Sequence, residues 1–207
     1  MIRLARDGGL WTATIDRPEK ANSLTGAMLD ELAGFAEAAA LEARVLVLTG
    51  TGRVFSAGAD LDEARAGLAT SPLWERLSGA IASAPILTIA ALNGTLAGGA
   101  FGMALACDLR IAVPGAKFFY PVMKLGFLPQ PSDPARLAGL VGPARAKMIL
   151  MAGQKIGADE ALAWGLVDRL VAPETLHETV AGLAADALGA TAAHVAGIKR
   201  LIPGGAG

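Results

Sequence analysis

The stretch "GTLAGGAFGMALACDLR", from Gly94 to Arg110, decides the fold because it joins a glycine-rich turn to an apolar helix. Gly98, Gly99 and Gly102 fall where that helix is predicted to begin. A glycine inside a helix costs about 1 kcal/mol relative to alanine, so its presence needs a reason. Glycine lets another backbone or a ligand approach closely, and the stretch therefore indicates either tight packing or a binding site at the helix start.

Outward from this stretch, short apolar strands alternate with helical segments. The runs "RVLVLTG" and "PILTIAALNG" predict strands at Val45–Thr49 and Ile86–Ala91, each covered on both faces. Alternating β-branched residues predict another strand at Leu10–Ile15, and "DLRIAV" and "LVDRLV" are strand-like. Apolar spacing and Gly or Pro punctuation predict helices at Asn22–Ala40, Leu73–Ser83, 98–107, 134–142, 143–153, 158–167 and from Pro173 to Arg200 with a break at Gly189.

This alternation is typical of an α/β fold with parallel strand pairing. No linker or low-complexity stretch divides the 207 residues. We therefore expect one domain over 1–207, with a core at about 1–172 and a short helical C-terminal region at about 173–207.

Composition excludes several classes of function. The net charge of −1 offers no basic field for nucleic acid, and the single cysteine rules out an internal disulfide or a multi-cysteine metal site. The N-terminus lacks an apolar signal segment, so we expect a cytoplasmic protein. The uncharged run Leu77–Cys107 is long enough to span a bilayer, but Pro85 and the glycines favour buried elements and no membrane partner.

Two loops of glycine and alanine follow predicted strands and lead into helices: "FSAGADL" at 55–61 and "LAGGAFG" at 96–102. The first turn of a helix presents unpaired N–H groups and the positive end of the helix dipole. Two such N–H groups aimed at one point would hold a carbonyl oxygen as it gains negative charge. Tight strand–helix packing explains either loop alone, whereas two similar loops in one small domain favour a site.

Other motifs fail on spacing. The glycines match neither the dinucleotide-binding fingerprint nor the phosphate-binding loop. Ser56 does not stand in a nucleophile-elbow pattern, and His177 and His194 lie in the final helical region, where we interpret them as surface or core residues. With so few histidines and cysteines, we expect no metal ion.

Five segments carry a resemblance to a known family: "TIDRPEKANSL", "VLVLTGTGRVFSAGADL", "ILTIAALNGTLAGGAFGMALACDLRIAV", "AKFFYPVMKLGFLP" and "GADEALAWGLVDRLV". In this order they resemble the enoyl-CoA hydratase/isomerase family, also called the crotonase family, from about Thr14 to Val171. The resemblance implies a spiral of β-β-α units, a homotrimer or hexamer, and a place in fatty acid metabolism. It implies an acyl-CoA ligand and no cofactor beyond the coenzyme A of that thioester.

The resemblance also implies a site, position by position. The backbone N–H groups of Ala59 and Gly99 would form an oxyanion hole for the thioester oxygen. Backbone carbonyls of Ala57, Ala59 and Leu61 would bind the adenine end of coenzyme A. Lys20 is a candidate contact for the coenzyme A phosphates.

Two departures from the family pattern put ordinary hydration in doubt. Hydratases of the family place and activate water with two glutamates. By position these fall on Gly102 and Val122, and neither residue can transfer a proton.

Asp133, in "QPSDPARL", is the candidate for a relocated acid/base residue. The alternative is a helix N-cap, because Ser or Asp before Pro at the first helical position suits "SDPARLAGL". Tyr120 either lines the acyl pocket or packs in the core. Asp60 is interpreted as a helix-start residue.

Three hypotheses of function follow. The first is an acyl-CoA-processing enzyme that stabilises a thioester enolate, with isomerisation or another one-base reaction of Asp133 rather than two-glutamate hydration. The second is a non-catalytic acyl-CoA-binding protein, motivated by the two missing glutamates. The third is a hydrolase that uses Ser56. The chain also ends before the helices that cover the acyl pocket in the family, so we expect a pocket that is more open or completed across a trimer.

Overall fold

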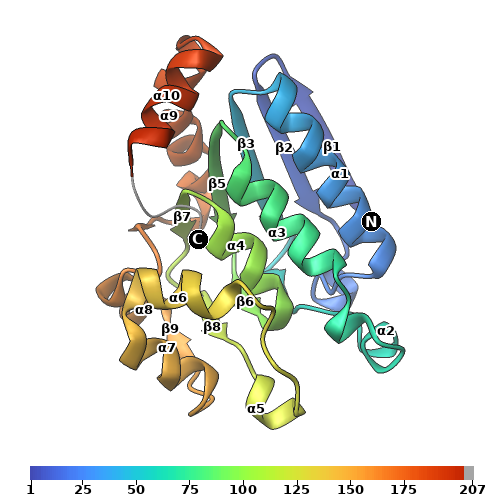
Figure 1. Cartoon of the computed structure of the whole chain (residues 1–207). Helices are drawn as coiled ribbons and strands as arrows, with labels where there is room; N and C mark the ends of the chain where they lie inside the picture. The colour runs from blue at the N-terminus through green and yellow to red at the C-terminus, as the bar shows by residue number, and fades with distance from the viewer. Residues whose placement is uncertain (203–207) are drawn as a thin grey trace.

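The computed structural model describes residues 1–202 and contains two β-sheets (Figure 1). The large sheet has the strand order β1-β2-β3-β5-β7-β10, and the small sheet has the order β4-β6-β8-β9. The strands are β1 Ile2–Asp7, β2 Leu10–Ile15, β3 Val45–Gly50, β4 Val54–Ser56, β5 Leu87–Leu92, β6 Thr95–Ala97, β7 Leu109–Ala112, β8 Lys117–Phe119, β9 Ile156–Gly157 and β10 Arg169–Leu170.

Helices connect and cover these strands. The α-helices are α1 Gly26–Glu42, α2 Leu61–Arg65, α3 Leu73–Ser83, α4 Phe101–Ala106, α5 Val122–Leu125, α6 Asp133–Val141, α7 Pro143–Leu150, α8 Ala158–Trp164, α9 Leu176–Gly189 and α10 Ala192–Leu201. Short 3₁₀ turns are η1 Pro18–Lys20, η2 Leu68–Thr70, η3 Gly98–Ala100 and η4 Pro173–Thr175.

Repeated units of two strands and a helix build both sheets at once. In each unit the first strand joins the large sheet and the second joins the small one, as in β3–β4, β5–β6 and β7–β8. The spiral of β-β-α units that the resemblance implies is therefore confirmed. The second strand of each unit was missed in the sequence, because three residues are too few to show alternation: β4 overlaps the expected loop "FSAGADL", and β6 overlaps the expected turn "LAGG".

The pairing is parallel within β2-β3-β5-β7-β10 and within β4-β6-β8. The expectation of parallel pairing is wrong at two edges, where β1 pairs antiparallel with β2 and β9 with β8. Strand β1 was not predicted at all. Strand β1 lies at the edge of the sheet, and Ile2 is its one buried residue. Its sequence therefore lacks the alternation of apolar and polar residues that predicts a strand.

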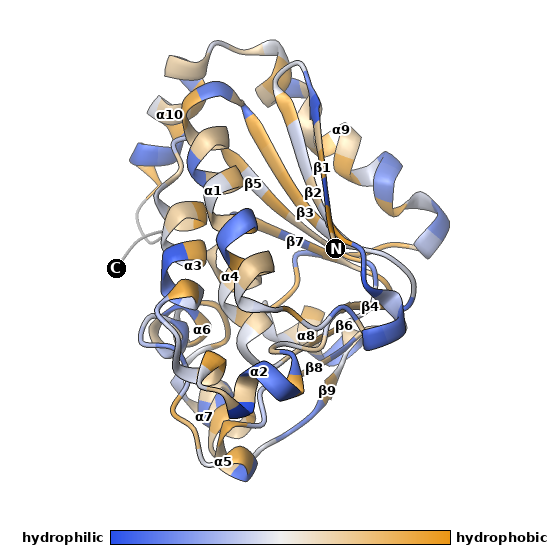
Figure 2. Cartoon of the chain, turned by 90° about the vertical axis from the view of Figure 1, so that its right-hand side faces the viewer, coloured by the Kyte–Doolittle hydropathy of each residue, from blue (hydrophilic) through white to orange (hydrophobic). Residues whose placement is uncertain are grey.

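Helices α1, α3 and α4 cover one face of the large sheet, and α9 covers the other (Figure 2). Strands β3 and β5 are buried along almost their whole length, as their apolar sequences predict. Helix α1 buries Met28, Leu29 and Leu32 on its inner face. It begins at Gly26, not at Asn22, because the Thr25 hydroxyl caps it by accepting from the Met28 N–H at 3.2 Å.

The C-terminal region folds back beside the large sheet, with α9 against β3, β5 and β7 (Figure 1). Helix α9 ends at Gly189, as predicted. The ammonium group of Lys199 in α10 donates to the Ile86 carbonyl at 2.9 Å and to the Asp108 carboxylate at 2.8 Å. Residues 203–207 of the expected C-terminal region lie outside the described residues.

Within residues 1–202 no single helix has both the length and the apolar character to cross a bilayer. The segments 173–189 and 192–201 together have that length and composition, but they are bent by 108° at the break between them.

Candidate active site

The two small-residue loops of the sequence lie side by side because the strands before them are neighbours. Strands β4 and β6 pair in parallel, so the loops that follow them leave the small sheet at the same end, beyond the carboxyl ends of the strands. A Cβ on Gly58 would lie 3.0 Å from the Ala97 carbonyl oxygen and 3.2 Å from the Gly99 nitrogen. Gly58 also has a φ of +93°, a conformation that side chains disfavour. The glycine therefore permits the two loops to touch.

Backbone hydrogen bonds hold the first loop on both sides of Ala59. The Leu24 N–H donates to the Gly58 carbonyl, and the Asp60 N–H donates to the Leu24 carbonyl, both at 2.8 Å. Among residues 1–202 the N–H of Ala59 donates to no protein atom. Ala59 is half-buried, and the bonds on both sides of it fix the direction of its N–H.

Gly99 lies in η3, directly before α4, and is also half-buried. A Cβ at this position would lie 3.2–3.3 Å from the indole ring of Trp74. The ring is itself fixed, because its Nε1 donates to the Leu68 carbonyl at 2.8 Å. Trp74 therefore backs the loop that carries Gly99.

Asp133 is the first residue of α6 and is almost wholly buried, with 1% of its surface exposed. Its Oδ2 accepts a hydrogen bond from the Tyr120 hydroxyl at 2.9 Å. Its Oδ1 is buried and has no hydrogen-bond partner within residues 1–202. The N-cap alternative is wrong for Asp133, whose carboxyl bonds Tyr120 rather than the helix backbone; Ser132, which the pattern also allowed, holds the N-cap position without a side-chain capping bond.

The free oxygen of Asp133 lies against Gly102. A Cβ on Gly102 would come within 2.8 Å of Oδ1. Gly102 is one of the two positions where the resemblance expects a glutamate, so the structure brings a carboxyl group to that place from another part of the chain. The other position, Val122, is buried at the start of α5.

Several influences act on the proton affinity of Asp133. Burial is the strongest and raises the pKa of its carboxyl to about 7. The Tyr120 hydrogen bond lowers that pKa, the Glu75 charge raises it, and Arg136 lowers it. Burial and the neighbouring Asp133 raise the pKa of Tyr120 well above its ordinary value, so Tyr120 remains a donor at neutral pH.

Other predicted residues surround the first loop. Ala57 is exposed, and Leu61 begins α2 with 73% of its surface exposed. Asp60 is the N-cap of α2, as interpreted, and accepts from the Asp62 and Glu63 N–H groups. It also binds Arg17 at 2.8 Å, which lowers its pKa. Lys20 is exposed in η1.

The environment of Ser56 gives no support to the hydrolase hypothesis. Its side chain is fully buried, and its hydroxyl donates to the Asn22 carbonyl at 2.8 Å while accepting from the Gly58 N–H. His177 and His194 are exposed on α9 and α10. Ser56 therefore shapes the first loop.

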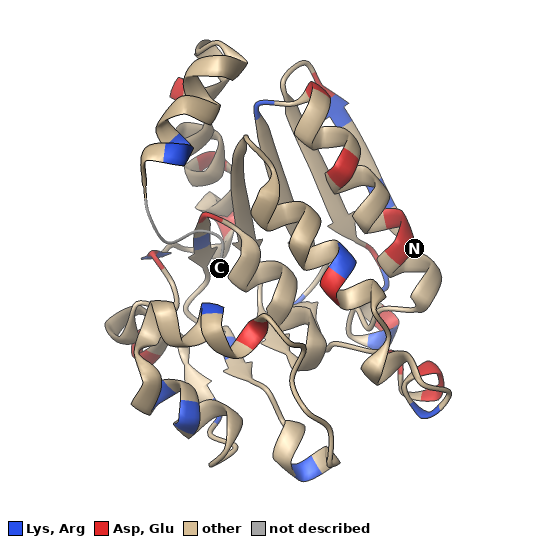
Figure 3. Ribbon diagram, viewed as in Figure 1, with Lys and Arg blue, Asp and Glu red and all other residues tan. Residues whose placement is uncertain are grey.

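Sequence reasoning missed Trp74, Glu75 and Gln130. The first two lie in the predicted helix Leu73–Ser83, and no local pattern indicates what they contact. Glu75 accepts from Ser132, 57 residues away, and the Gln130 side chain donates to the Ala69 carbonyl at 3.0 Å. Figure 3 shows α6 with acidic and basic positions beside α4, which has none.

Two hollows lie elsewhere on the molecule. One of about 590 Å³ lies between β1, β3 and the start of α9, and one of about 500 Å³ lies along α10. Neither is lined by Ala59, Gly99 or Asp133.

Known proteins resemble this chain in sequence and in fold. The family described as enoyl-CoA hydratase/isomerase matches residues 5–203. A Rhodobacter capsulatus protein named "Probable enoyl-CoA hydratase" is 40% identical over 171 residues, which are 80% of this chain and 66% of that protein. The chain thus spans about two thirds of the length of that relative. A carnitinyl-CoA dehydratase of Salmonella arizonae is 36% identical over 97% of this chain and 79% of its own length.

Solved structures show the same likeness. The enoyl-CoA hydratase of Bacillus anthracis superimposes with a TM-score of 0.88 at 31% identity, covering 96% of this chain and 81% of that one. An enoyl-CoA hydratase structure from Geobacillus kaustophilus gives 0.86 at 34% identity, covering 96% and 79%. The five sequence segments, the β-β-α spiral and these matches agree, and the chain belongs to the enoyl-CoA hydratase/isomerase, or crotonase, family.

Proposed function

We propose that this chain is an acyl-CoA-processing enzyme that works by one-base chemistry. The thioester oxygen accepts hydrogen bonds from the N–H groups of Ala59 and Gly99 and becomes an enolate oxygen. Asp133 removes a proton from the carbon next to the thioester and returns it to a carbon further along the acyl chain. The double bond moves, no atom is gained or lost, and the reaction is an isomerisation.

One observation carries this proposal: the buried Oδ1 of Asp133, unpartnered within residues 1–202 and next to Gly102. Leaving a buried hydrogen-bond acceptor without a donor costs about 1–3 kcal/mol of stability. An unpartnered carboxyl oxygen at this position therefore indicates a function. A carboxyl with a pKa of about 7 is also suited to exchange protons near neutral pH.

The oxyanion hole is supported by backbone placement. Gly58 brings the two loops into contact, and the Ala59 N–H is left without a protein acceptor among the described residues. Preorganised donors of this kind favour the charge that develops in an enolate. No second carboxyl stands at Val122, which is why isomerisation fits better than hydration by two glutamates.

Turnover of a panel of 2-enoyl-CoA and 3-enoyl-CoA thioesters tests the proposal. Asp133→Asn keeps the size of the side chain and its acceptor for Tyr120 but removes the base. We expect a loss of about 10²–10⁴-fold in kcat, the usual contribution of a positioned base. Asp186→Asn, an exposed change on α9, is the matched control and should keep wild-type turnover. Equal turnover of the two variants would remove Asp133 from the mechanism.

The second candidate function is a non-catalytic acyl-CoA-binding protein. It is favoured by Gly102 and Val122, which leave both expected glutamate positions without a titratable group. It predicts saturable binding of acyl-CoA by calorimetry and no turnover of any thioester in the panel. Isomerisation by the purified wild type, sensitive to Asp133→Asn, would contradict it.

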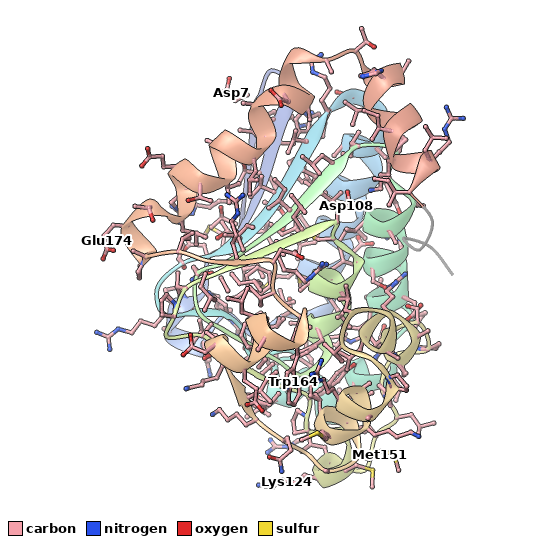
Figure 4. The ribbon with its side chains drawn as sticks, turned by 90° about the vertical axis from the view of Figure 1, so that its left-hand side faces the viewer. Asp7, Asp108, Lys124, Met151, Trp164 and Glu174 are labelled. Carbon is pink, nitrogen blue, oxygen red and sulfur yellow. The ribbon has the colours of Figure 1, made fainter. Side chains whose placement is uncertain are left out.

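We also propose that the protein forms a homotrimer or hexamer. Exposed apolar side chains gather on and after α5, at Met123, Leu125 and Leu128. Figure 4 places Lys124 of α5 and Met151 at the same end of the molecule. Sedimentation or light scattering measures the mass directly, and a monomer at micromolar concentration would contradict this proposal.

A further inference from the structure

Glu75, on the first turn of α3, reaches the segment that leads into α6. Its two carboxylate oxygens each accept from the Ser132 hydroxyl at 2.9 Å, and Oε1 also accepts from the Ser132 N–H at 3.2 Å. Ser132 is the N-cap residue of α6, directly before Asp133. A carboxylate at a helix N-terminus interacts favourably with the free N–H groups there. Glu75 therefore fixes the residue from which the Asp133 backbone starts.

The residue before Glu75 contacts the other half of the site. Trp74 packs on Gly99, in η3 directly before α4. Successive residues of a helix point about 100° apart, so one turn of α3 can hold two different segments. The first turn of α3 thus contacts both the loop of the oxyanion hole and the start of α6.

We propose that Glu75 is a positioning residue for Asp133: through its hydrogen bonds to Ser132 it holds the Asp133 carboxyl against Gly102. This inference rests on the proposed function of Asp133. It goes further, because it assigns the behaviour of that carboxyl to a residue of another helix.

The charged and titratable groups that face Asp133 come from three elements. Glu75 comes from α3, Arg136 from α6 itself, and Tyr120 follows β8. Helix α4, which packs on α6, contributes none, since its sequence is FGMALA. Glu75 is the one negative charge in this set and opposes ionisation of Asp133.

Glu75→Gln separates charge from shape. A glutamine can still accept from the Ser132 N–H and hydroxyl through its oxygen, but it carries no charge. Glu75→Ala removes both the charge and the hydrogen bonds. Glu178→Gln, an exposed change on α9, repeats the change in net charge far from the site and serves as the control.

Two readouts are measured on the folded, full-length protein. Carbon-13 NMR of aspartate carboxyl groups, with Asp133 assigned from its loss in Asp133→Asn, gives the titration midpoint of Asp133 directly. In Glu75→Gln we expect that midpoint to fall by about half a pH unit or more, since a nearby like charge is gone. The acid limb of the kcat profile should move to lower pH by the same amount, with KM unchanged.

The outcomes separate this inference from the proposed function. An Asp133 midpoint that stays in place in Glu75→Gln, or moves equally in Glu178→Gln, overturns the role of Glu75. Glu75→Ala should lose about tenfold more kcat than Glu75→Gln, because the carboxyl is no longer held. If Asp133→Asn keeps full turnover, the proposed function fails, while the NMR midpoint still decides what Glu75 does.

Discussion

The two small-residue loops, 55–61 and 96–102, and the Asp133 cluster meet at η3 and the start of α4, yet they are built from different groups. In the proposed oxyanion hole the backbone N–H groups of Ala59 and Gly99 provide the functional groups, and glycine and alanine keep side chains out of the way. Around Asp133 the functional groups are side chains from α3, α6 and the segment after β8. The loop half of the site therefore depends on close packing of backbone segments. The Asp133 half depends on contacts between particular side chains.

The largest expected difference between the halves is in the pH dependence of stability. Burial raises the pKa of Asp133 from 3.8 to about 7 in the folded protein. Between these values the folded state binds a proton that the unfolded state has lost, so the free energy of unfolding falls as pH rises, by up to about 4 kcal/mol. Asp133→Asn should remove most of this slope in urea unfolding from pH 4 to pH 8. An unchanged slope would show that Asp133 is not buried as described.

Gly58→Ala tests the backbone half. Its Cβ would lie 3.0 Å from the Ala97 carbonyl at a φ of +93°, so the two loops must separate. Loss of one oxyanion donor costs on the order of 10²–10³-fold in kcat. Gly34→Ala, in α1 with nothing within 4 Å of its Cβ, is the matched control and should keep activity. Full activity of Gly58→Ala would argue against an oxyanion hole made by these loops.

Gly102→Ala tests the contact between the halves and should have a smaller effect. Its Cβ would lie 2.8 Å from the Asp133 Oδ1, which a side-chain rotation can relieve. We expect a loss of about tenfold in kcat, because a small misplacement of a base is costly. Affinity for coenzyme A thioesters, measured by calorimetry, should not change. A loss of affinity with kcat intact would instead place Gly102 in substrate binding.

Asp60→Asn should have the smallest effect. Asparagine preserves the N-cap of α2, so only the ion pair with Arg17 is lost. We expect a small decrease in the free energy of unfolding and little change in kcat. A large fall in kcat would mean that the first loop uses a charged side chain after all.

The same contrast explains what the sequence could predict. The strand runs at Val45–Thr49 and Ile86–Ala91 and the helix at Leu73–Ser83 are local patterns, and each was found within a residue or two. The glycines of both loops are also visible in the local sequence, so the loops could be predicted. The partnership of Asp133 with Gly102 and Glu75 joins segments far apart in the chain, and no spacing rule indicates it.

Local sequence patterns also gave wrong predictions where a residue makes a long-range hydrogen bond instead. "SDPARLAGL" satisfies the pattern for an N-cap, yet Ser132 donates its hydroxyl to Glu75 and Asp133 bonds Tyr120. Apolar spacing predicts a helix that begins at Asn22. In the structure the Asn22 side chain donates to the carbonyls of Thr51 and Val54, and these bonds hold the residue outside α1. In both cases polar side chains satisfied distant backbone or side-chain groups instead of nearby ones.

The contact between Gly102 and Asp133 also constrains how this chain can change by mutation. With the Asp133 carboxyl in its present position, a Cβ at position 102 would lie 2.8 Å from its Oδ1. A side chain at position 102 therefore displaces the Asp133 carboxyl, and a glutamate there would compete with it for the same place beside α4. Position 102 and position 133 are thus coupled: the benefit of a carboxyl at one depends on what occupies the other.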